Sequence, residues 1–125
     1  MEEWKLDFEW LRVRHLVKDS MGKKELPDLQ SILYLIGIQE LGRWEGDKNF
    51  TKEEKQDLMH VAMCTLLEDE GYFTFEGRDQ DGWPHWKENI AFKISGLEDQ
   101  EVFLKKKVIR YFQALEQLEK DSLKQ

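Results

Sequence analysis

Apolar residues recur at helical spacing along most of the chain and predict four helices. The first covers residues 8–19, where the apolar positions form two adjoining rows. The rows are Phe8, Leu11 and His15 in one, and Trp10, Val13 and Val17 in the other. The alternation of Trp4, Leu6, Phe8 and Trp10 is equally typical of a strand, so both interpretations stay open for the beginning of the chain.

The second helix is apolar around most of its circumference. Pro27 suits its first turn, because the missing amide proton costs nothing there. The apolar positions are Leu29, Ile32, Leu33, Leu35, Ile36, Ile38 and Leu41. A helix that is apolar on nearly all sides is typical of a buried, central position.

Two capping patterns predict the third and fourth helices. Thr51-x-x-Glu54 has the form of a capping box and opens a helix that stops before Gly71. Ser95-x-x-Glu98 repeats the pattern before a long helix over 97–118. The long helix carries one apolar stripe, made of Leu104, Val108, Tyr111, Leu115 and Leu118.

An aromatic segment at residues 72–92 interrupts the helices. Residues 72–75 have strand propensity and Asp81-Gly82 is a turn signal, so a β-hairpin is expected near residues 72–88. The segment either caps the core or presents a binding surface, and the sequence leaves both open. We therefore predict a mainly α fold, with about four helices around one core and a small β-hairpin, as a single helical domain over 1–125.

Composition narrows the classes of partner. The chain has 125 residues and a net charge of −7, which disfavours binding to nucleic acid or to an anionic membrane. The single cysteine, Cys64, excludes an internal disulfide and suits a reducing compartment. The beginning of the sequence has no pattern of a secretory signal, so a cytoplasmic location is expected.

The sequence gives weak signals for metal binding. His60 and Cys64 are four residues apart on one helix, but nothing in the sequence gathers further ligands around them. Asp79-Gln80-Asp81-Gly82 resembles the opening of a calcium loop without the acidic residue that should close it. We expect no bound metal and no cofactor.

Motifs of covalent and nucleotide-dependent catalysis are also missing. The chain has no nucleophile elbow, P-loop or dinucleotide fingerprint. Cys64 lies within its predicted helix, away from any group that would lower the pKa of the thiol. These observations lean against an enzyme and leave no catalytic residue to name.

The aromatic segment supplies the candidate binding residues. Aromatic side chains recur in binding hot spots, and here they lie beside acidic ones. The candidates are Tyr72, Asp79, Asp81, Trp83, His85 and Trp86.

Three segments carry a resemblance to a known group of proteins. They are Gln39–Trp44, Lys55–His60 and Asp79–Trp86. In these segments the chain resembles an uncharacterised family of short bacterial conserved hypothetical proteins, mostly from the Bacteroidetes, with no assigned function. The resemblance implies a bacterial cytoplasmic protein and supplies no catalytic residues.

Together these features favour a small acidic helical protein that acts by protein–protein contact. A homodimer is one form of that contact, with the stripe of the last helix partly free and Lys105 to Lys107 facing acidic residues of a second copy. The alternative is a small-molecule-binding domain or enzyme with a pocket between the aromatic hairpin and the helices.

Overall fold

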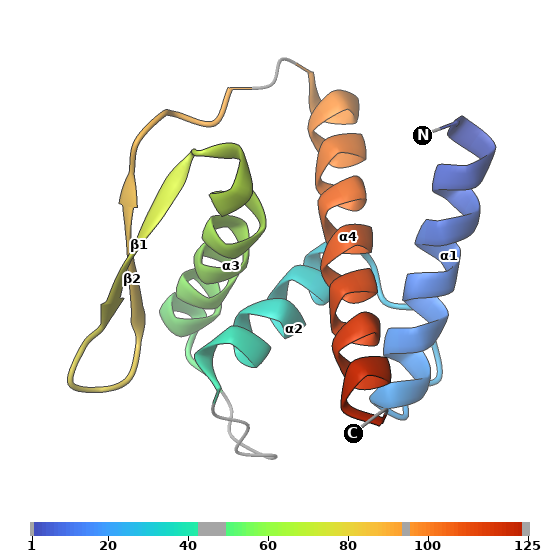
Figure 1. Ribbon diagram of the computed structural model, residues 1–125, viewed down its shortest axis with the longest axis horizontal. Helices are drawn as coiled ribbons and strands as arrows, with labels where there is room; N and C mark the ends of the chain where they lie inside the picture. Colours follow the sequence, from blue (N-terminus) through green and yellow to red (C-terminus); the bar gives the residue numbers. More distant parts are fainter. Residues whose placement is uncertain (1, 43–49, 94–95, 124–125) are drawn as a thin grey trace. The chain divides into compact units, whose positions relative to one another are not determined.

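The computed structural model describes residues 2–42, 50–93 and 96–123, with four α-helices, a short 3-10 helix and one β-hairpin (Figure 1). The elements are α1 (Glu3–Ser20), α2 (Leu29–Leu41), α3 (Lys52–Leu67), η1 (Glu68–Glu70), β1 (Phe73–Arg78), β2 (Pro84–Glu88) and α4 (Leu97–Leu123). This confirms the predicted fold class, a mainly α chain with a hairpin near residues 72–88. Arg43, Trp44 and Ser95, which the motifs above include, lie outside the described residues.

The chain forms two compact units. Unit 1 contains residues 1–28 and 94–125, and therefore α1 and α4, while unit 2 contains residues 29–93. The single helical domain expected over 1–125 stays a prediction. Among the described residues, no helix combines the length and apolar character needed to span a bilayer.

In unit 1, α1 is a helix from Glu3 onward, which decides against the strand interpretation of the first residues. Its side chains Leu6, Trp10, Val13 and Val17 are buried. Figure 1 shows α1 and α4 side by side and running in the same direction. The buried centre of α4 is Lys107, Val108 and Ile109, of which the latter two are fully buried.

In unit 2, α2 lies against α3. The prediction of a buried second helix is confirmed by six buried residues, namely Ile32, Leu33, Ile36, Gly37, Ile38 and Leu41. The two helices approach closely at Gly37, because a Cβ built there would lie 2.7 Å from the carbonyl carbon of Leu58. The contact depends on a residue with no side chain.

The hairpin follows α3 after the short 3-10 helix η1. The predicted capping box opens α3, with Thr51 Oγ1 accepting from the Glu54 amide at 3.1 Å and Glu54 Oε1 accepting from the Thr51 amide at 2.9 Å. Gly71, at φ 83°, ends η1 in the left-handed conformation that favours glycine. The antiparallel strands pair Phe75 with Trp86, and a bulge between Phe75 and Gly77 shifts the register.

Candidate functional site

The loop between the two strands is organised by the carboxylate of Asp79. Its Oδ1 accepts hydrogen bonds from the amides of Asp81 (2.9 Å) and Trp83 (3.0 Å). Its Oδ2 lies 2.8 Å from Nε2 of His85, which donates to it. The hydrogen bond from His85, then the one from Trp83, holds the pKa of Asp79 below its ordinary value. Four of the candidate binding residues, Asp79, Asp81, Trp83 and His85, therefore take part in the hydrogen bonds that shape the loop.

This arrangement predicts acid sensitivity of the loop. Because the pKa of Asp79 is lowered by folding, its stabilising effect is complete above the unfolded value of about 3.9 and is lost as the pH falls through the lower folded value. In an NMR titration, we expect the amide shifts of Asp81 and Trp83 to change with a midpoint below that ordinary value. In Asp79→Asn the same amides should not titrate there, and a wild-type midpoint at or above the ordinary value would contradict the prediction.

The same loop is anchored to the end of α2 by Arg78. Its Nη1 donates to the carbonyl oxygens of Leu41 (3.0 Å) and Gly82 (2.8 Å), and its Nη2 donates to that of Glu40 (2.6 Å). The last carbonyls of a helix have no partner within the helix. One guanidinium thus satisfies two of them and fixes the loop on the helix end.

The aromatic candidates do not share one surface. Trp83 packs against a buried cluster of Ile38, Leu41 and Leu58, so its ring belongs to the core of unit 2. His85 and Trp86 are consecutive in β2 and point to opposite faces of the hairpin.

Two of the aromatic candidates, Trp86 and Tyr72, pack against other aromatic rings. Trp86 pairs with Phe75 at 5.1 Å between ring centroids, and Tyr72 pairs edge to face with Phe92 at 5.5 Å. Asp81 is exposed. The candidate residues therefore divide among the core, the loop and ring pairs of the hairpin.

Cys64 and His60 form the expected pair on α3, with Sγ and Nε2 3.5 Å apart. The thiol is fully buried, and burial together with the charge of Glu88 raises its pKa to about 12. A thiol with so high a pKa is a poor nucleophile and a poor metal ligand. Among the residues that the structure describes, no group of three or more His, Cys, Asp or Glu side chains could hold a metal ion.

A row of large apolar side chains is exposed along one side of α1. Trp4, Phe8 and Leu11 are 68%, 61% and 44% exposed and follow one another at spacings of four and three. We call these three residues the α1 apolar face. His15, four residues further along, is also exposed.

The sequence interpretation placed the two rows of α1 side by side, and this was wrong. A step of two residues, from Phe8 to Trp10, turns roughly 200° around a helix axis. The rows therefore lie on opposite sides, and only the row of Trp10, Val13 and Val17 is buried. A helical wheel of both rows was the signal that could have shown that they lie on opposite sides, although it does not say which of the two is exposed.

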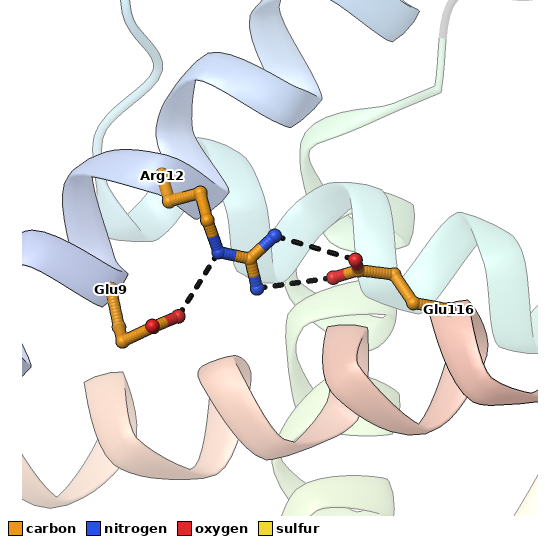
Figure 2. Close-up of polar contacts among 3 residues, drawn as sticks. All are labelled: Glu9, Arg12 and Glu116. Carbon is orange, nitrogen blue, oxygen red and sulfur yellow. Dashed lines mark hydrogen bonds and ion pairs between the residues drawn. The ribbon is translucent and has the colours of Figure 1, made fainter.

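An ion cluster between α1 and α4 fixes which side of α1 faces outward (Figure 2). The guanidinium of Arg12 donates from Nε to Glu9 at 3.0 Å. It also donates to both carboxylate oxygens of Glu116 on α4, at 3.1 and 3.4 Å. The hydrogen bond to Glu116, then the one to Glu9, raises the pKa of Arg12. We call these three residues the Arg12 cluster.

Two lysines of α4, Lys105 and Lys107, make contacts within unit 1. Lys107 is only 5% exposed, and its Nζ lies 5.7 Å from the centroid of the Phe103 ring. Lys105 forms an ion pair with Glu101 at 3.5 Å and lies over the ring of Trp10. The burial of Lys107 contradicts the prediction that Lys105 to Lys107 together face a second copy, whereas for Lys105 and Lys106 it stays a prediction.

Comparisons with known proteins identify no relative of this chain. No family model, no curated protein and no solved structure matches the chain. The resemblance to a family of short bacterial proteins stays a prediction, and function has to be argued from the surface itself.

Proposed function

We propose that this chain works by protein–protein contact through the α1 apolar face. The observation that carries the proposal is the row of Trp4, Phe8 and Leu11, exposed on a helix whose opposite side is already buried. Single exposed apolar residues are ordinary, whereas a contiguous group of large ones marks an interaction site.

These exposed side chains gain free energy when a partner removes them from water. Large aromatic residues contribute most to binding when a partner removes them from water, and tryptophan is the commonest of them at binding hot spots. The α1 helix is anchored to α4 by the Arg12 cluster, so the face is presented on a rigid element. A prearranged face avoids part of the entropic cost of association.

A small-molecule pocket between the hairpin and the helices has less support. It would need Tyr72, Trp83, His85 and Trp86 to converge, whereas Trp83 packs into the core of unit 2 and His85 and Trp86 point to opposite faces of the hairpin. The setting that we propose for the protein contact is the cytoplasm, since the chain has one cysteine and no disulfide to maintain.

Photo-cross-linking in the cells that produce the protein tests this function. A benzophenone amino acid in place of Phe8 should give a discrete cross-linked protein product after irradiation. The matched control is the same substitution at Leu118, which lies on α4 and is 62% exposed against 61% for Phe8. A product at residue 118 alone, or at neither residue, would overturn the proposal.

A further inference from the structure

The geometry points to a second copy of this chain as the partner, with the α1 apolar faces of two copies pairing as antiparallel helices about a two-fold axis. This inference rests on the proposed function, since it names the partner of the same face. Two-fold pairing requires that one surface be complementary to itself. The charges of α1 and the spacing of its apolar residues support this pairing.

Nearly all of the net charge of the chain lies in unit 2. Residues 29–93 contain thirteen acidic and seven basic residues, a net charge of −6 out of the −7 of the whole chain. Unit 1 has thirteen acidic and twelve basic residues, and α1 itself has four of each. Two acidic chains repel each other least through a neutral surface. A basic partner protein, by contrast, would be drawn to unit 2 and not to α1.

The spacing of the apolar row allows the side chains of two copies to form layers. An antiparallel arrangement that centres the row places Phe8 opposite the partner's Leu11, and Trp4 opposite the partner's His15. Phe8 of each copy then covers Leu11 of the other, and the exposed His15 covers the indole ring of Trp4. Alternating layers of this kind are how two helices interlock side chains.

Charged residues lie on both flanks of the row. Asp7 and Arg14 lie on one flank, Lys5 and Arg12 on the other. In the antiparallel pair, each flank of one helix faces the same flank of the partner helix. Asp7 therefore comes near the partner's Arg14. Arg14 donates to the backbone oxygens of Leu26 and Pro27, which carry no formal charge and do not neutralise its guanidinium.

On the other flank, the charge that a partner helix meets is set by the Arg12 cluster. Its two carboxylates and one guanidinium carry a net charge of −1, so Lys5 of one copy meets a negative group on the other. In a parallel pair, Asp7 would instead meet that same negative cluster and be repelled. The flanks therefore favour the antiparallel orientation, and salt should weaken the preference.

The size of the face sets the expected affinity. From their exposed fractions, Trp4, Phe8 and Leu11 offer roughly 300 Å² of apolar surface in each copy. That is less than half of the roughly 800 Å² that each partner contributes to a standard interface. We therefore expect a weak, reversible dimer with a Kd on the order of 10 μM.

Sedimentation equilibrium of the full chain from 1 to 200 μM tests the pairing. The weight-average mass should rise from the monomer mass of 15.1 kDa toward twice that value. Phe8→Glu should raise the Kd at least tenfold, whereas Leu118→Glu, at a residue of equal exposure on α4, should leave it unchanged. Circular dichroism checks that both variants keep the fold. A wild-type monomer throughout, or dissociation by Leu118→Glu alone, would overturn the inference.

A distance measurement tests the orientation. Ser20 is exposed at the last position of α1 and outside the row, so a spin label on Ser20→Cys leaves the apolar face intact. The antiparallel pair separates the two labels by about 30 Å along the helix axis, while a parallel pair brings them within about 15 Å. Cys64 is fully buried and should remain unlabelled. The shorter distance would overturn the antiparallel arrangement.

The cross-linking product at Phe8 separates this inference from the proposed function. A product of twice the chain mass supports both. A product with another protein, together with a monomer in sedimentation, keeps the proposed function and overturns pairing with a second copy. If no product forms at Phe8, both fail.

Discussion

Replacing Gly37 with alanine should destabilise the protein by about 3 kcal/mol, although alanine is the better helix former. Gly37 lies within α2, where helix propensity alone would predict a gain of about 1 kcal/mol. The expected sign is reversed because the added Cβ would meet the backbone of α3. Its distances to the carbonyl carbon and Cα of Leu58 would be 2.7 and 3.1 Å.

Relief of this clash requires one whole helix to move. The atoms concerned belong to the Leu58 backbone, so no side-chain rotation can make room. Leu58 is itself fully buried and belongs to the cluster with Ile38 and Leu41. Displacing α3 would open gaps in this close-packed cluster. Even a small gap between two atoms removes much of the van der Waals attraction between them.

Urea denaturation followed by circular dichroism measures the effect on the free energy of unfolding. Gln39→Ala is the matched control, because Gln39 lies on the exposed side of the same helix and should change stability by less than about 0.5 kcal/mol. An unchanged or raised stability of Gly37→Ala would show that the two helices do not approach as closely as described.

The fold could be predicted largely from local chemistry. The capping box of Thr51 and Glu54 forms as expected, and the apolar circumference of residues 29–41 marks a helix that is buried. Both signals act within a few residues of the chain, which is why the sequence is sufficient to recognise them. The close approach at Gly37 could not be predicted in this way, because it depends on which helix lies opposite.

The candidate site could be predicted only in part. Trp83, His85 and Trp86 looked like one aromatic group, but neighbouring strand residues face opposite ways and Trp83 is needed by the core. Conversely, Trp4 and Phe8 looked like ordinary apolar positions of a helix. Their exposure follows from the side on which α1 meets α4, and a pattern along one helix does not contain that choice.

Replacing Arg78 with alanine should destabilise unit 2 by about 1 to 2 kcal/mol. The guanidinium donates three hydrogen bonds to the carbonyl oxygens of Glu40, Leu41 and Gly82. Hydrogen bonds to a charged group are stronger than neutral ones, but Arg78 is exposed and water can replace part of each. The measurement is again urea denaturation, combined with amide hydrogen exchange in the loop at residues 79–83.

Arg78→Lys is the control that separates charge from geometry. Lysine keeps the positive charge near the negative end of α2, but its single ammonium group cannot reproduce the planar fork that spans Glu40, Leu41 and Gly82. We expect it to recover less than half of the lost stability, while the amides of Asp81 and Trp83 still exchange faster than in the wild type. Full recovery would mean that charge alone holds the loop, and unchanged exchange in Arg78→Ala would mean that Asp79 is sufficient to hold it. The loop then depends on two adjacent residues with separate tasks, Asp79 shaping it from within and Arg78 anchoring it to the helix.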